Sequence, residues 1–320
     1  YEVDSRTDAA SRSYHVSPLS IQRFGSRGSG EPGLRMRILA RQDIEKLITM
    51  REAIAAMEEV FAALTEKEAQ VPDRTVLTLD RSDNSVLFMP GYLKRTGGVG
   101  LKVVSVFPTN AAKGIPIISA QIMMCDPANG EVNAILEGGY ITALRTAATT
   151  AVATKYLARG DACSLGVFGA GVQAKSQIEA HREIRNLSRV VIYDVDKTKA
   201  EALAQHFQLL CGQSCTCSAA GSPEELVTLS DIIITATTSQ TPVFKGDSLL
   251  KGTHLNAIGS YKPHVREVDD ATIRRSRIFV DSYEHASREA GDLIIPLETG
   301  VIGEHHILGE LGELVLGRKK

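Results

Sequence analysis

Long apolar runs and an excess of either charge are the features that this 320-residue sequence most plainly lacks. No uninterrupted apolar run approaches about 18 residues, which argues against a transmembrane helix. The 36 Lys and Arg nearly balance the 38 Asp and Glu, so the formal net charge is only -2. Bulk charge therefore gives no attraction to nucleic acid or to an anionic membrane, and we expect neither as a partner.

A paired cysteine motif is also missing. The five cysteines are an odd number, which fits reduced thiols in a cytosol better than a disulfide framework, so we expect a cytoplasmic protein. Cys211, Cys215 and Cys217 lie close together in the sequence, but they lack the C-x-x-C spacing of zinc ribbons. The pattern predicts no metal site.

Residues 1–36 lack the apolar stretch of a secretory signal. They are rich in Ser, Arg and Gly, and we expect a disordered arm or a non-native start, with Met36 as a candidate true start. An organellar transit peptide would share the Arg and Ser, but four acidic residues argue against one: Glu2, Asp4, Asp8 and Glu31.

Residues 37–145 are predicted to form an α+β domain for substrate binding and dimerisation. Apolar residues between Asp43 and Leu64 recur at helical spacing, which predicts one or two amphipathic helices. Short β-type runs follow, separated by turn signals such as Asp83-Asn84 and Gly97-Gly98. The predicted strands are residues 74–79, 85–89, 99–106, 117–125 and 131–136.

Residues 146–299 are predicted to form a doubly wound, Rossmann-type NAD(P) domain, which makes the chain an α/β protein. A helix rich in Ala and Thr, residues 140–157, leads into it, and strands and helices then alternate. The predicted strands are residues 164–168, 189–193, 232–235, 254–258 and 277–280, and the predicted helices are residues 173–185, 197–210 and 223–229.

A glycine turn, Gly169-Ala170-Gly171-Val172-Gln173-Ala174, follows the first of these strands. Gly169 permits a tight turn, Gly171 lets the backbone approach a pyrophosphate, and Ala174 allows close packing of helix on strand. The next helix then points free N–H groups and the positive end of its dipole at the phosphates. The turn predicts a dinucleotide site that includes Ala170, Val172 and Gln173.

Asp194 comes directly after the second strand, 25 residues after Gly169. A carboxylate in this place accepts hydrogen bonds from the adenosine ribose and repels a 2′-phosphate, which favours NAD. Lys197 and Lys199 could neutralise such a phosphate, so NADP is left open.

Several motifs together resemble the ornithine cyclodeaminase/mu-crystallin family, and the resemblance covers essentially residues 36–320. They are Pro72-Asp73-Arg74-Thr75, Met89-Pro90, Gly100-Leu101-Lys102, residues 141–148 (ITALRTAA), the glycine turn, residues 256–259 (NAIG) and Val280-Asp281-Ser282. The ITALRTAA run is the most distinctive of them.

The resemblance implies an enzyme that acts on a small amino acid or imino acid and forms a homodimer through its first domain. Arg74 and Arg145 would bind the substrate carboxylate, since guanidinium groups hold carboxylates bidentately. Lys102 would stand at the reacting carbon–nitrogen bond as the catalytic group, because a partly desolvated lysine between arginines has a lowered pKa. The cofactor site is expected to include Thr146, Thr235, Ala236, Thr237 and Gly259.

Two residues depart from the family's cyclodeaminases. Leu87 stands shortly before Met89-Pro90, where those enzymes carry a glutamate, and Tyr261 stands where a catalytic aspartate would follow Gly259. Without these carboxylates, ring closure with loss of ammonia is hard to assign. Reduction of an imine asks less of the protein: a bound carboxylate, a hydride and a proton on nitrogen. We expect Lys102, with Tyr261, to supply the proton.

The sequence therefore favours an NAD(P)-dependent reductase of a cyclic imine such as Δ1-pyrroline-2-carboxylate or a related ketimine. The alternatives are ornithine cyclodeaminase, which is a lyase, alanine dehydrogenase, and a non-catalytic, crystallin-like protein that binds NAD(P). The resemblance also implies that residues 300–320 complete the first domain and that family members continue further. Reduced stability or impaired dimerisation is expected of a shortened end.

Overall fold

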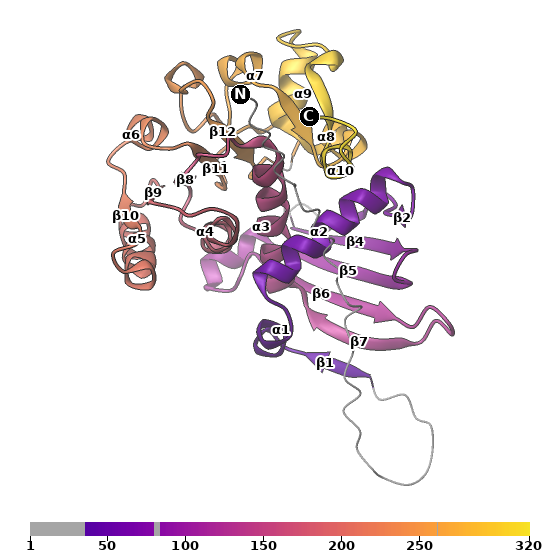
Figure 1. Cartoon of the computed structure of the whole chain (residues 1–320). Coiled ribbons are helices and arrows are strands. Elements are labelled where there is room, and N and C mark those ends of the chain that lie inside the picture. Colours follow the sequence, from indigo (N-terminus) through magenta and orange to yellow (C-terminus); the bar gives the residue numbers. More distant parts are fainter. Residues whose placement is uncertain (1–35, 80–83, 261) are drawn as a thin grey trace, which may run out of the picture. The chain divides into compact units, whose positions relative to one another are not determined.

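The computed structural model describes residues 36–79, 84–260 and 262–320, and Met36–Lys320 form one compact unit. This unit contains two main sheets, and α3 (Gly138–Leu157) runs between them in contact with both (Figure 1). The arm predicted for residues 1–36 lies outside the described residues except for Met36. In the part of the chain that is described, no helix is long and apolar enough to cross a membrane.

The first sheet has seven strands, mostly antiparallel, in the order β1-β7-β6-β5-β4-β2, with β3 also paired to β4. The strands are β1 (Arg37–Leu39), β2 (Ala69–Gln70), β3 (Thr75–Leu79), β4 (Asn84–Leu93), β5 (Gly98–Val106), β6 (Ile118–Cys125) and β7 (Val132–Glu137). The predicted strand ending at Met89 was too short, because β4 continues through Pro90. Along one edge of β4, the pairing with β3 ends at Phe88 and the pairing with β2 begins at Tyr92. Pro90 lies between them, so its missing N–H breaks no hydrogen bond on that edge.

Two helices form where one or two were expected, α1 (Arg41–Leu47) and α2 (Met50–Thr65). Thr49 separates them through a capping box. Its hydroxyl accepts from the N–H of Glu52 at 3.2 Å, and the Glu52 carboxylate accepts from the N–H of Thr49 at 2.8 Å. A short 3-10 helix, η1 (Pro108–Lys113), precedes β6. The long helix α3 is capped by the Glu137 carboxylate, which accepts from two backbone N–H groups of its first turn.

The second sheet has five parallel strands in the order β10-β9-β8-β11-β12. They are β8 (Ser164–Phe168), β9 (Arg189–Tyr193), β10 (Thr216–Ala219), β11 (Ile232–Thr235) and β12 (His254–Ala257), and the connecting helices are α4 (Val172–Ile184), α5 (Lys197–Cys211) and α6 (Pro223–Thr228). Parallel strands joined by crossover helices confirm the predicted Rossmann-type α/β fold.

Two predictions for this sheet were wrong. The strand β10 was missed, because its four residues, TCSA, include no large apolar side chain. The segment at 277–280 was assigned to the Rossmann sheet, but β13 (Ile278–Val280) instead pairs with β14 (Ile307–Glu310) in a separate two-stranded sheet. Pairing with a strand from the C-terminal segment cannot be read from one short apolar run.

The C-terminal segment returns to the helices of the first sheet. Gly312 in α10 (Leu311–Val315) lies against the backbone of Phe61 in α2, where a side chain would collide. This packing agrees with the expectation that residues 300–320 join the first domain, although the domain limits remain a prediction. The other elements are η2 (Gly246–Ser248), α7 (Asp270–Arg275), α8 (Tyr283–Glu289), α9 (Gly291–Glu298) and η3 (Glu304–His306).

A buried polar network fixes α3 to the Rossmann sheet. The Thr154 hydroxyl lies 2.9 Å from Nε2 of His181 and accepts from Nδ2 of Asn256, on β12, at 3.0 Å. Burial lowers the pKa of His181 and of His254 to about 4, so both imidazoles are neutral at neutral pH. The helix that carries Arg145 is therefore held firmly against the sheet that carries the glycine turn.

Candidate active site

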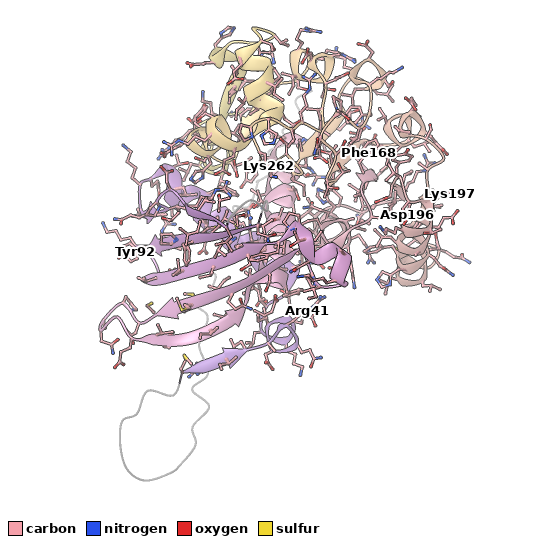
Figure 2. All side chains as sticks on the ribbon, turned by 180° about the vertical axis from the view of Figure 1, so that it is seen from behind. Arg41, Tyr92, Phe168, Asp196, Lys197 and Lys262 are labelled. Atoms are coloured by element: carbon pink, nitrogen blue, oxygen red, sulfur yellow. The ribbon has the colours of Figure 1, made fainter. Side chains whose placement is uncertain are left out.

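The glycine turn lies where the order of the parallel strands reverses. The chain goes from β8 outwards to β9 and β10, and then returns to the other side of β8 for β11. Ligands of such sheets bind beyond the carboxyl ends of the strands at this switch point. Figure 2 shows Phe168, the last residue of β8, on the same part of the molecule as Asp196 and Lys197 at the start of α5, away from Tyr92 of β4.

The turn has the geometry that a pyrophosphate needs. Gly169 has a φ of +94°, and a side chain there would collide with the carbonyl of Ala236. Gly171 faces open space, and no side chain caps the N-terminus of α4. Val172 is 77% exposed, and among the described residues the buried Oε1 of Gln173 has no hydrogen-bond partner. This open helix N-terminus fits an anion.

Asp194 is anchored beside the turn. One carboxylate oxygen accepts from the N–H of Ala170 at 2.7 Å, and the other accepts from the N–H of Asp196 at 2.8 Å. The residue is half-buried, and each oxygen keeps a lone pair for a further donor. The structure thus places Asp194 next to the glycine turn, as its position in the sequence indicated.

The loop after β11 lies along the same edge. The Ala236 N–H donates to the carbonyl of Phe168 at 2.9 Å, which holds this loop against the glycine turn. Within the described ranges, the buried hydroxyl of Thr235 has no hydrogen-bond partner. Thr146 belongs to α3, and its hydroxyl donates to the carbonyl of Thr142. The structure therefore brings the β11 loop to the turn, whereas Thr146 is occupied within its own helix.

Glu267 organises this edge, and sequence reasoning missed it. Its fully buried carboxylate accepts from the N–H and hydroxyl of Thr237 at 2.7 and 2.6 Å, and from the N–H of Gly259 at 2.8 Å. One buried side chain therefore fixes the loops after β11 and β12 together. In the sequence, Glu267 is marked only by valines on either side, in Val265-Arg266-Glu267-Val268. This pattern alone indicates no particular role.

Three cations form a second group. Lys102 lies on β5, Arg145 lies on α3, and Arg74 lies just before β3, where it forms an ion pair with Glu289 at the end of α8. Within the described part of the chain, neither Lys102 nor Arg145 has a side-chain hydrogen bond or an ion pair. Two cations without partners, beside a third held by a displaceable carboxylate, make a site for an anion.

Burial and mutual repulsion set the proton affinity of this cation group. Burial, and then the charges of Arg145 and Arg74, lower the pKa of Lys102 to about 8. Surrounding protein also lowers the pKa of Arg145, which nearby Asp281 partly offsets. Part of the Arg145 surface is nevertheless exposed, so an incoming ligand can reach it. Lys102 can therefore both hold and release a proton close to neutral pH, while the arginines stay charged.

A chain of contacts joins the cation group to the loops held by Glu267. Glu289, the partner of Arg74, is followed by Ala290 and then by Gly291 and Asp292 at the start of α9. The Asp292 carboxylate accepts from the N–H of Glu267 at 2.7 Å and of Val268 at 3.0 Å. The two groups of predicted site residues are thus fastened to one another through the C-terminal segment.

Of the two residues that depart from the cyclodeaminases, the structure describes Leu87 alone. Leu87 is half-buried on β4 between Val76 of β3 and Val104 of β5, so an apolar side chain occupies this position in the sheet. Tyr261 lies outside the described residues, and its role in proton transfer stays a prediction.

Comparison with known proteins gives a consistent result. The ornithine cyclodeaminase/mu-crystallin family model matches residues 35–320. The chain is 36% identical over 285 residues to a Δ1-pyrroline-2-carboxylate reductase of Bacillus cereus, covering 89% of this chain and 87% of that protein.

Two solved structures are also similar. One is a Thermococcus litoralis Δ1-pyrroline-2-carboxylate reductase in complex with NADH and L-proline, with a TM-score of 0.85, 42% identity, and 89% and 88% of the two chains covered. The other is an archaeal alanine dehydrogenase dimer with bound NAD, with a TM-score of 0.81, 33% identity, and 89% and 86% covered.

Proposed function

The chain belongs to the ornithine cyclodeaminase/mu-crystallin family, and we propose that it is an NAD-dependent reductase of a small cyclic imino acid, most simply Δ1-pyrroline-2-carboxylate. The observation that carries the proposal is the cation group: Lys102 and Arg145 without partners, with Arg74 beside them, fastened to a Rossmann glycine turn. An anionic substrate and a proton donor are what this reaction requires.

The residues at the switch point fit NAD. The open N-terminus of α4 would receive the pyrophosphate, and Asp194 would accept from the hydroxyls of the adenosine ribose. Thr237 and Gly259, held by Glu267, would line the path to the nicotinamide end. When bound, the reduced cofactor supplies the hydride for the imine carbon.

The cation group would hold the substrate and supply its proton. Arg145 and Arg74 would bind the carboxylate, with Glu289 released from Arg74 as the substrate enters. The Lys102 ammonium would donate a proton to the ring nitrogen as the carbon–nitrogen double bond becomes single, and it would then regain a proton from water. Balanced atom for atom, one hydride and one proton convert the imine into the amine.

Reduction fits this site better than cyclodeamination. Ring closure of ornithine needs a base to take protons from amino groups, and Leu87 offers none at the position where the cyclodeaminases carry glutamate. The test is NADH oxidation with Δ1-pyrroline-2-carboxylate, run beside ammonia release from ornithine and beside oxidation of alanine. Turnover of the cyclic imine supports the proposal. Ammonia release in its place would overturn it, and NADH binding without any turnover would favour a crystallin-like binding protein.

Asp194 is expected to determine the choice between NADH and NADPH. Asp194→Ser removes the carboxylate that repels a 2′-phosphate, so the preference for NADH over NADPH, measured as a ratio of kcat/KM, should fall by at least about tenfold. Asp196→Asn is the matched control, because it removes a charge two residues away while keeping an N-cap for α5. An unchanged ratio in the Asp194 variant would remove this residue from the site.

Glu267→Gln is expected to loosen the cofactor edge. A glutamine has one acceptor oxygen, so the N–H of either Thr237 or Gly259 loses its partner, at a cost of about 1–3 kcal/mol. We expect KM for NADH to rise by about tenfold, with KM for the imine changed much less. Glu225→Gln, which affects a surface bond to Gly221, serves as the control. Equal changes in both KM values would instead point to general loosening of the fold.

We also propose that the protein is a homodimer formed through the seven-stranded sheet. Large apolar side chains are exposed on and beside this sheet: Val76, Leu77, Leu79, Ile115, Ile117 and Ile118. Exposed apolar residues gathered in one part of a sheet are typical of an interface. The similar archaeal alanine dehydrogenase is a dimer. Molar mass from light scattering tests the assembly, and the cytoplasmic location stays a prediction.

A further inference from the structure

Three cysteines that lie close together in the sequence also come together in space at the end of α5. Cys211 is the last residue of this helix, Cys215 precedes β10, and Cys217 lies on β10. Their three sulfurs all lie within 4.8 Å of one another, and the sulfurs of Cys211 and Cys217 are 4.0 Å apart. Figure 1 shows α5 and β10 side by side at the edge of the five-stranded sheet.

The backbone around these sulfurs is fixed before any ligand arrives. Ser214 bonds the carbonyl of Cys211 through both its N–H, at 3.2 Å, and its hydroxyl, at 2.7 Å. The Gln208 side chain spans the turn: its oxygen accepts from the N–H of Cys217 at 2.8 Å and its amide donates to the carbonyl of Gly212 at 2.6 Å. The turn therefore presents three thiols in a set geometry, which lowers the entropic cost of binding a common ligand.

The spacing of the sulfurs matches a single metal ion. With a metal–sulfur bond of about 2.3 Å, tetrahedral geometry places sulfurs ~3.8 Å apart. The observed 4.0 Å between Cys211 and Cys217 needs almost no adjustment. Soft thiolate ligands select Zn²⁺ and Cu⁺ over harder cations. We propose that Cys211, Cys215 and Cys217 together bind one thiophilic metal ion of this class.

The surroundings suit such a complex. Cys211 and Cys215 line a surface pocket of about 400 Å³ together with Arg182 and Arg185, which gives an ion access and leaves room for water as a fourth ligand. Arg182 favours the charged form of Cys215 and would offset the negative charge of a three-thiolate complex. Burial raises the pKa of Cys215 and of Cys217, with Cys211 adding to the effect, so metal binding would release protons from these thiols.

The cluster is separate from the candidate active site. The strands β9 and β10 are parallel, and Cys217 pairs with Val190 near the amino end of β9, whereas Asp194 follows the carboxyl end. The metal would therefore stabilise the α5–β10 edge and take no part in the reaction. The sequence predicted no metal because it lacks C-x-x-C pairs, but a helix end and a strand supply the proximity that the spacing does not.

The test is titration of the reduced, full-length protein with Cd²⁺, followed by thiolate-to-cadmium absorption in the ultraviolet, with Zn²⁺ as competitor. We expect one ion per chain. Cys211→Ser, Cys215→Ser and Cys217→Ser should each weaken Cd²⁺ binding by at least tenfold, while Cys125→Ser, on β6, should leave it unchanged. A wild-type protein without the absorption band, or a band that survives loss of Cys217, would overturn the proposal.

A second measurement uses the wild-type protein alone, so it does not depend on whether a cysteine variant folds. Zn²⁺ should slow alkylation of Cys217 in the native protein by at least tenfold and leave the rate at Cys125 unaltered, as read by mass spectrometry of peptides. Equal rates with and without Zn²⁺ would contradict the site. A Cys211–Cys217 disulfide that forms in air, with no Cd²⁺ binding after reduction, would show that the cluster is a redox pair instead.

Discussion

Lys102→Ala should lower kcat for reduction of the imine by about 10²–10⁴-fold, the range that a positioned proton donor contributes. NADH binding should be unaffected, because Lys102 lies on β5 of the seven-stranded sheet and not at the glycine turn. Fluorescence of bound NADH and steady-state turnover measure the two effects separately. Turnover within tenfold of the wild type would remove Lys102 from the reaction.

The pH dependence should carry the signature of the same lysine. Because the pKa of Lys102 is lowered to about 8, the ammonium is lost as the pH rises through this value. Reduction needs the ammonium, so kcat/KM for the imine should fall by tenfold per pH unit above about 8. Oxidation of proline needs the neutral amine and should rise towards a plateau over the same interval. A lysine with an ordinary pKa would leave the reduction profile flat there, and the oxidation profile would go on rising beyond this interval without a plateau.

Two further variants separate charge from proton transfer. Lys102→Arg keeps the positive charge but cannot release a proton near neutral pH, so it should be nearly as inactive as the alanine variant. Lys94→Ala, at an exposed position at the end of β4, should have wild-type activity. Lys102→Ala also removes a desolvated cation that two arginines repel, so we expect its melting temperature to equal or exceed that of the wild type. A melting temperature at least equal to that of the wild type would show that the lost activity of Lys102→Ala is not caused by unfolding.

The sequence predicted those parts of the candidate site that depend on local chemistry. Gly169 could be assigned because its φ of +94° is a property of the turn itself, and Asp194 could be assigned because it follows a recognisable strand. The proposed roles of Lys102 and Arg145 came from motif resemblance, since nothing local indicates that β5 and α3 bring them together.

What the sequence concealed depends on contacts between distant segments. Glu267 has no local feature that marks it, and its importance comes from bonds to Thr237 and Gly259. The strand β10 was missed for a related reason: its small side chains form a strand because β9 offers a partner. The thiol cluster is a different case, because its cysteines are close in the sequence and meet where the chain turns from the end of α5 into β10. Long-range pairing and bonds overrode local propensity in the first two cases.

Arg145→Met should lower kcat/KM for the carboxylate substrate by about 30-fold to several thousand-fold, which corresponds to the loss of about 2–5 kcal/mol for a charge pair that becomes desolvated when the substrate binds. Most of this loss should appear as a raised KM, and some as a lower kcat, because the carboxylate also orients the imine carbon towards the hydride. Arg145→Lys should recover only part of the loss, since an ammonium cannot form two parallel bonds. Steady-state kinetics of the three proteins test this order.

The control lies in the nearby Arg288, which pairs with Asp73 and Glu284 at exposed positions. Arg288→Met removes a similar cation without touching the cation group, so its kcat/KM should stay within about threefold of the wild type, since exposed ion pairs contribute about 1 kcal/mol or less. An equal loss in both variants would mean that net charge, and not a bound carboxylate, explains the effect.

Arg145 also acts on Lys102, and this coupling provides the sharpest check. Arg145 is the stronger of the two charges that lower the lysine's pKa, so Arg145→Met should move the alkaline limb of the reduction profile to higher pH. In parallel, the wild type should prefer Δ1-pyrroline-2-carboxylate strongly over Δ1-pyrroline, which has no carboxylate, and the variant should lose most of that preference. A residue that merely supported the fold would lower both rates alike and leave the limb in place. Both shifts together would therefore require that one guanidinium binds the substrate carboxylate and sets the proton affinity of the donor.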